Sequence, residues 1–106
     1  MTEVVMILTT VSTSEQFTEI AKALVSEKLA ACVQMSSPIV SMYSWEGALE
    51  TEEEIAITIK TTSEISERVV ARLVELHPFV VPQITIVPVI GGYSPYLEWV
   101  KENTKA

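Results

Sequence analysis

The sequence predicts an α+β fold, in which an antiparallel sheet carries two helices on one face. Three observations indicate it. Hydrophobic segments with strand and helix periodicity alternate along the chain, their order is β-α-β-β-α-β-α, and the length is 106 residues. That length fits one domain, and the first six segments have the order of the ferredoxin-like split β-α-β motif. We therefore expect residues 1–106 to form a single ferredoxin-like domain with a helix at its C-terminal end.

The first two segments are a buried strand and an amphipathic helix. Residues 4–10 form a continuous apolar run that is too short for a helix, which is typical of a buried strand. In the hydroxyl-rich stretch that follows, the spacings Ser12 to Glu15 and Thr13 to Gln16 are those of a capping box. Apolar residues then recur at helical spacing, which predicts a helix over about residues 14–29.

Two long extended segments form the middle of the chain. Residues 31–45 are rich in β-branched, aromatic and small side chains, residues 46–48 are a turn signal, and a second extended segment runs to about Lys60. The first arm would span on the order of 45 Å at ~3.3 Å per residue, which is longer than a domain of this size covers. We expect its apolar outer part to pair with another subunit, and a strand bent back at Pro38 is the alternative.

The last third of the chain contains two further helices and one strand. Thr61 and Glu64 open a helix that ends before Pro78, and residues 83–89 have the pattern of a strand. Ser94-Pro95 then predicts the start of a short helix that reaches about residue 103.

The composition is acidic. All 14 acidic residues are glutamate, against five lysines and two arginines, so the net charge is −7. This charge argues against nucleic-acid partners and against an anionic membrane surface. Cys32 is the only cysteine, the first residues lack the basic start of a signal peptide, and no apolar run approaches the ~20 residues that span a bilayer. We expect a soluble, cytoplasmic protein with no nucleic acid and no membrane among its partners.

Five short pieces, spread over nearly the whole chain, match one known pattern in order. They are Leu29-Ala30-Ala31-Cys32-Val33; Ser41, Tyr43, Trp45, Gly47 and Leu49; Glu54 with Lys60-Thr61; His77-Pro78 with Pro82 and Ile84; and Tyr96-Leu97 with Trp99. In these pieces the sequence resembles the CutA1 family of divalent-cation tolerance proteins. The resemblance implies a ferredoxin-like domain in a tight trimer with long hairpins between subunits. It also implies a link to copper and other divalent metals, and no established enzymatic reaction.

One stretch departs from the family pattern. Family members usually read His-Pro-Tyr-Glu-x-Pro-Glu-Ile, whereas this chain reads His-Pro-Phe-Val-Val-Pro-Gln-Ile over residues 77–84. Val80 and Gln83 stand where the two carboxylates usually are, and Phe79 lacks the tyrosine hydroxyl. A hard cation held by those oxygens in relatives would lose these ligands here.

Cys32 and His77 are the candidate metal ligands. A closed zinc site needs about four Cys or His ligands, and one chain supplies one of each. Cu(I) accepts two or three soft ligands, which a trimer would supply from copies of Cys32 or from residues across an interface. The competing interpretations are that Cys32 is a small buried hydrophobe and that His77 caps the end of the second helix.

The remaining candidates belong to a subunit interface or to a ligand pocket. Glu50, Glu52 and Glu54 share one strand face, which is either a carboxylate ladder for a hard cation or a solvated face. Glu54 and Lys60 have the same strand parity, so together they would line a polar pocket. The bulky side chains expected at the interface are Met42, Tyr43, Trp45, Tyr96 and Trp99, with the wall of an inter-subunit ligand pocket as their alternative role.

The sequence therefore predicts a non-enzymatic homotrimer linked to divalent-metal (copper) tolerance or to metal-responsive signalling. It requires no cofactor, and copper or another divalent metal ion is the expected ligand. The alternative is a trimeric module that senses a small molecule in a pocket at the subunit interface. Catalysis finds little support, because the chain has one histidine, no aspartate and no glycine-rich phosphate loop.

Overall fold

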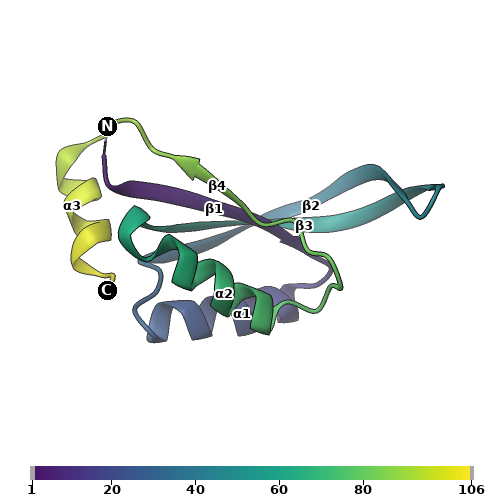
Figure 1. Cartoon of the computed structure of the whole chain (residues 1–106), viewed down its shortest axis with the longest axis horizontal. Coiled ribbons are helices and arrows are strands. Elements are labelled where there is room, and N and C mark those ends of the chain that lie inside the picture. The colour runs from purple at the N-terminus through teal and green to yellow at the C-terminus, as the bar shows by residue number, and fades with distance from the viewer. Residues whose placement is uncertain (1, 106) are drawn as a thin grey trace.

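The computed structural model describes residues 2–105, which form a four-stranded antiparallel sheet with two helices on one face and a third helix at one end (Figure 1). The elements in chain order are β1 (Val4–Val11), α1 (Ser14–Ser26), β2 (Cys32–Trp45), β3 (Ala48–Thr62), the short 3-10 helix η1 (Ser63–Ile65), α2 (Ser66–Leu76), β4 (Thr85–Pro88) and α3 (Ser94–Glu102). The strands lie in the order β2-β3-β1-β4, and each neighbouring pair is antiparallel. The predicted α+β class and split β-α-β order are confirmed.

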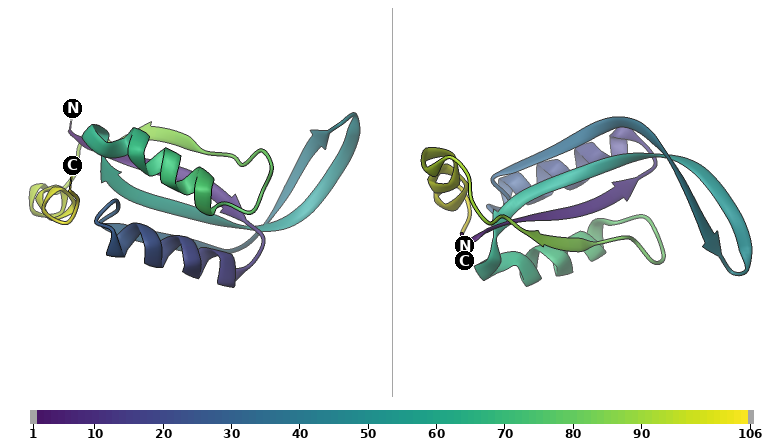
Figure 2. Two further views of the ribbon diagram at one scale, coloured as in Figure 1. Left: turned by 60° about the horizontal axis from the view of Figure 1, so that its bottom comes forward. Right: turned by 90° about the horizontal axis from the view of Figure 1, so that it is seen from above.

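The core lies between the sheet and the pair α1 and α2. Odd-numbered residues of β1 and β3 face the helices, and Ile7, Ile57 and Ile59 are at most 1% exposed there. From the helices, Leu24 and Leu73 are fully buried against them. The left view of Figure 2 shows α1 and α2 side by side on this face. On the opposite face neither α1 nor α2 is present, α3 contacts it where Lys60 lies over Tyr96, and Met6, Leu8 and Val87 on this face are half-buried.

Helix α1 begins as predicted and ends earlier. Its capping box is formed by Thr13 and Gln16: Thr13 Oγ1 accepts from the amide of Gln16, and Gln16 Oε1 accepts from the amide of Thr13, at 3.2 Å each. The expected end near residue 29 is wrong. Lys28 has a φ of 63°, and the amides of Leu29 and Ala30 turn back to the carbonyl of Leu24, which terminates the helix after Ser26.

The other boundaries shift by a few residues. Strand β3 continues past Lys60 to Thr62 because Thr62 still pairs with Val4 of β1. The second helix is preceded by η1 and begins at Ser66. The last strand is shorter than the predicted residues 83–89, because only Thr85–Pro88 pair with β1. Glu46 and Gly47 form the predicted turn, and their φ values of 51° and 81° are those of a two-residue type I′ hairpin.

Residues 38–54, here called the outer hairpin, extend beyond the rest of the sheet. Strand β1 pairs with β3 only over residues 55–62, so among the described residues the outer hairpin consists of two strands with no third. A register shift between Met35 and Pro38 marks the place where the hairpin bends, which is visible in Figure 2. The bend at Pro38 was the alternative prediction, but the hairpin does not fold back on the domain, which is 44 Å long (Figure 1).

The outer hairpin exposes apolar side chains on one of its faces. Val40, Met42 and Leu49 share this face, and their exposed fractions are 71%, 66% and 74%.

No helix among the described residues is long and apolar enough to cross a membrane.

Candidate functional site

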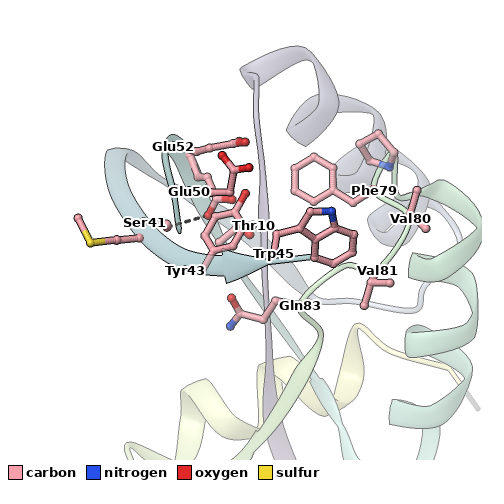
Figure 3. A pocket seen from close by; sticks show the side chains of 13 residues that line it. Thr10, Ser41, Tyr43, Trp45, Glu50, Glu52, Phe79, Val80, Val81 and Gln83 are labelled. Carbon is pink, nitrogen blue, oxygen red and sulfur yellow. Dashed lines mark hydrogen bonds between the residues drawn. The ribbon is translucent and has the colours of Figure 1, made fainter. Parts of the chain in front are cut away.

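A cavity, here called the hairpin-base cavity, lies between the outer hairpin and the loop after α2, along the hairpin face that runs from Glu54 at the base to Trp45 beside the turn. Its volume is about 650 Å³. One wall is the hairpin face that carries Ser41, Tyr43, Trp45, Glu50, Glu52 and Glu54. Loop residues from Pro78 to Gln83 form the opposite wall, and Thr10 at the end of β1 contributes to the floor (Figure 3). Met42 also borders the cavity.

Strand pairing explains why the first wall is both acidic and aromatic. Ser41 lies opposite Glu52, and Tyr43 lies opposite Glu50, so alternate residues of both strands project to the same face. The sequence prediction that Glu50, Glu52 and Glu54 share a face is confirmed. This face turns toward the cavity, whereas Val40 and Leu49 project from the other face of the hairpin.

Glu54 is the most buried of the three carboxylates. Its exposed fraction is 8%, and Ser41 Oγ donates a hydrogen bond of 2.8 Å to its Oε2. The bond joins the two strands of the hairpin at the point where it leaves the sheet. It also holds the carboxylate of Glu54 in one position at the cavity wall.

Ser41→Ala is expected to destabilise the protein because it removes this partner from a buried carboxylate. The cost should be about 1–3 kcal/mol in the free energy of unfolding. Urea denaturation at a fixed protein concentration measures it. Ser12→Ala, at an exposed serine outside the outer hairpin, is the control and should change stability by less than about 0.5 kcal/mol. Equal effects of the two substitutions would show that the bond to Glu54 contributes nothing.

Tyr43 carries the second polar group of the hairpin wall. Partial burial of its phenol raises its pKa, and the carboxylate of Glu52 raises it further. Glu54 and Glu50 act in the same direction from longer range. The phenol therefore stays protonated at neutral pH and is available as a hydrogen-bond donor next to the carboxylates.

His77 fixes the loop that forms the opposite wall. Its Nδ1 accepts a hydrogen bond of 3.2 Å from the amide of Phe79, so the network assigns the ring proton to Nε2. Nε2 donates to the carbonyl oxygen of Thr10 at 2.9 Å and lies 3.0 Å from Oγ1 of Thr9. The imidazole also contacts the ring of Phe79, with 4.8 Å between centroids. His77 is the C-cap residue of α2, and its amide donates to the carbonyl of Leu73 at 2.8 Å, whereas its ring joins the loop to β1.

The stability of the fold is expected to fall as the pH drops below the ordinary pKa of histidine. Burial lowers the pKa of His77 from 6.5, and the hydrogen bond to Thr10 opposes this only in part. The unfolded state therefore binds the proton more readily, so the stabilisation is complete above pH 6.5 and is lost progressively as the pH falls toward the lowered value. Urea unfolding at about pH 7.5 and about pH 5.5 measures the change.

His77→Gln is the control for this pH dependence, since glutamine has a donor and an acceptor but does not titrate in this range. The variant should lose less stability than the wild type between the two pH values. If both proteins lose the same amount, His77 is not the group responsible.

The structure does not bring the two predicted metal ligands together. Cys32 is half-buried and pairs with Lys60, near the end of the sheet where β2 begins, whereas His77 contacts Thr9 and Thr10 near the opposite end of β1. Both ring nitrogens of His77 are already hydrogen-bonded. Within residues 2–105, no cluster of three or more His, Cys, Asp or Glu side chains could hold a metal ion. Within the described part of one chain, Cys32 and His77 therefore do not belong to one common site.

Lys60 and Glu54 are also separated. Glu54 lines the cavity, whereas Lys60 Nζ lies 5.5 Å from the ring centroid of Tyr96 and donates to Gln34 at 3.0 Å. The ring of Tyr96 stacks on that of Trp99, with 5.8 Å between centroids. Six residues along β3 correspond to about 20 Å. The candidates therefore fall into two groups, one at the outer hairpin and one where α3 meets the sheet.

Comparison with known proteins identifies the family to which the chain belongs. The family described as CutA1 divalent ion tolerance protein matches residues 5–103. The chain belongs to the CutA1 family. All five sequence pieces that resembled CutA1 proteins lie inside this range, so the predicted resemblance is confirmed.

Two relatives and two solved structures illustrate the similarity. The divalent-cation tolerance protein CutA of Thermus thermophilus is 41% identical over 104 residues, covering 98% of this chain and 99% of the relative. Human Protein CutA is 38% identical over 88 residues, which are 83% of this chain and 49% of the human protein. This chain thus aligns with about half of the human relative's length.

The solved structures agree with the sequence comparison. The divalent cation tolerance protein CutA1 of Thermus thermophilus superposes with a TM-score of 0.92 at 38% identity, covering 96% of this chain and 99% of that one. CutA from Xylella fastidiosa superposes with a TM-score of 0.95 at 35% identity, covering 98% of this chain and 100% of that one. The sheet order and the long hairpin are therefore those of the CutA1 fold.

Sequence reasoning missed part of the cavity wall. Thr10, Phe79 and Val81 line the cavity, yet none of them was a candidate. The family stretch after His77 was the available signal, because it lies next to the matched His-Pro pair. The stretch was interpreted only as having lost two carboxylates, whereas Phe79 and Val80 in it form an apolar part of the cavity wall.

Proposed function

We propose that this CutA1 chain acts in divalent-cation tolerance as a non-enzymatic homotrimer. The observation that carries the proposal is the outer hairpin, whose two strands have no third strand beside them among the described residues and whose apolar face is exposed. An exposed apolar hairpin of this length is an aggregation hazard unless another chain covers it. The half-buried apolar residues Met6, Leu8 and Val87 on the sheet face opposite α1 and α2 support self-association as well.

The link to metal is supported by the names of the relatives. Relatives that cover nearly the whole chain are called divalent-cation tolerance proteins. Because one chain does not assemble a metal site among its described residues, we propose that ligands come from more than one chain, with Cys32 as the soft donor. His77 is the weaker candidate, since a metal ion bound to either ring nitrogen would replace the hydrogen bond that this nitrogen makes to Thr10 or to Phe79. The same bonds make it a poor general base, which supports a non-enzymatic role.

Titration with copper under reducing, oxygen-free conditions, against a competing chelator, tests the metal role. We expect tight binding with a simple ratio of copper to chains, and its loss in Cys32→Ser. Thermal unfolding of the variant without copper serves as the control for folding. Weak binding that is unchanged in Cys32→Ser would contradict copper as the ligand.

The cavity at the base of the outer hairpin supports a second candidate function. A volume of about 650 Å³ is within the usual range of small-molecule sites, ~300–1,000 Å³. Its walls combine aromatic and apolar side chains with a few converging polar groups, as such sites do. In this second proposal the assembly senses a small molecule, and the outer hairpin transmits its binding to the neighbouring subunit.

A further inference from the structure

The charge on the walls of the hairpin-base cavity has one sign. Three lining residues are carboxylates, namely Glu50, Glu52 and Glu54, and none of the lining residues within the described range 2–105 is Lys, Arg or His. The cationic Lys60 lies elsewhere, over Tyr96. A cavity with walls of one charge attracts and concentrates ligands of the opposite charge. Its occupant should therefore be positively charged.

Glu54 adds a largely buried carboxylate to the cavity wall. An ionised carboxylate can accept about four hydrogen bonds, and the hydroxyl of Ser41 donates one to Oε2. The side chain is 8% exposed and lines the cavity. The carboxylate of Glu54 therefore contributes acceptor oxygens to the cavity wall and is held in place by Ser41.

The spacing of the carboxylates does not suit a bare metal ion. Residues two apart on a strand are separated by about 6.6 Å, so Glu50 and Glu54 are about 13 Å apart along β3. A calcium ion needs six to eight oxygens at about 2.3–2.6 Å. This matches the absence of a metal-holding cluster among residues 2–105. Such a row suits an extended molecule with spaced charges.

The aromatic side chains favour an organic cation. Tyr43, Trp45 and Phe79 line the cavity, and in Figure 3 the rings of Trp45 and Phe79 lie to one side of the carboxylates of Glu50 and Glu52. Aromatic faces attract ammonium and guanidinium groups, most strongly when these are partly desolvated. Phe79 and Val80, which depart from the usual family stretch, make this wall apolar.

We propose that the hairpin-base cavity binds a small organic cation that carries ammonium or guanidinium groups. The proposal rests on the second candidate function, since it needs the cavity to be a ligand site, and it names the class of ligand. The cationic groups pair with the carboxylates of Glu50, Glu52 and Glu54. The carbon chain between them lies against Trp45 and Phe79.

Calorimetric titration of the purified protein with agmatine, which carries one ammonium and one guanidinium group, tests the proposal. The buffer should contain about 0.15 M salt to screen nonspecific attraction to the acidic surface. We expect saturable binding of agmatine, weaker binding of 1,4-diaminobutane, and none of the neutral 1,4-butanediol or of calcium. Calcium binding to the same side chains, or equal binding of the neutral diol, would overturn the assignment.

Matched variants distinguish binding in the cavity from nonspecific attraction to the acidic surface. Glu52→Gln should weaken agmatine binding about tenfold, the effect of one lost charge-assisted hydrogen bond. Glu53→Gln removes the same charge from the opposite face of the same strand and should leave binding unchanged. Trp45→Leu should weaken binding several-fold, whereas Tyr93→Leu, at an exposed ring just before α3, should not. Equal weakening by Glu52→Gln and Glu53→Gln would show that surface charge alone explains the binding, and would contradict a site in the cavity.

The controls also separate this proposal from the function on which it rests. If a neutral or anionic metabolite from a thermal-shift panel binds and agmatine does not, the ligand class is wrong while the cavity remains a small-molecule site. If nothing in the panel binds, both the ligand class and the second candidate function fail. Neither result depends on copper.

Discussion

Replacing both Val40 and Leu49 with lysine is expected to convert the protein from an assembly of three chains to a single chain. The two side chains lie on the exposed apolar face of the outer hairpin. In the proposed trimer this face is covered by a neighbouring subunit, so two buried ammonium groups would cost several kcal/mol each unless they were paired. Light scattering coupled to size-exclusion chromatography measures the mass directly.

The control for this experiment is Val74→Lys. Val74 is 55% exposed on α2, on the helical side of the domain, so its replacement adds charge without touching the outer hairpin. Its mass should equal that of the wild type. If Val40→Lys/Leu49→Lys stays assembled as well, the apolar face of the hairpin is not the contact between subunits.

Leu24→Ala is expected to have the largest effect on stability among single substitutions in α1. Leu24 is fully buried in the core between α1 and the sheet. Truncation removes its methyl groups from the core and leaves a cavity that the surrounding isoleucines fill only in part. The expected loss is about 2–5 kcal/mol in the free energy of unfolding. Urea denaturation should be performed at one protein concentration, because assembly would add to the apparent stability.

The neighbouring residue provides a matched comparison. Val25 is 42% exposed on the same helix, so Val25→Ala should change stability by less than about 1 kcal/mol. A similar loss in both variants would contradict the assignment of the buried helix face.

Periodicity was enough to predict the order of the elements and the sheet class. The two extended segments around residues 46–48 were found as β2 and β3, and the capping box at Thr13 marked the start of α1. The ends of elements were less accurate, because they depend on tertiary pairing. β4 is limited by where β1 lies beside it, and α1 ends where Lys28 adopts a left-handed conformation without a glycine to signal it.

The candidate site was predicted only in part, because local patterns show which residues share a face but not which distant segments meet. Strand parity correctly placed Glu50, Glu52 and Glu54 on one face. Parity also grouped Glu54 with Lys60. The two residues are six positions apart on β3 and the hairpin bends near Pro38, so Glu54 lines the cavity while Lys60 lies over Tyr96. The hydrogen bonds of His77 to β1 and the loop join segments that are distant in sequence, so no local pattern could show them.

The mass of the wild-type protein in solution tests the central claim most directly. Light scattering over a range of protein concentrations should give the mass of three chains of 11.7 kDa each, independent of dilution. A mass of one chain throughout the range would contradict the proposed homotrimer and leave the exposed face of the outer hairpin unexplained.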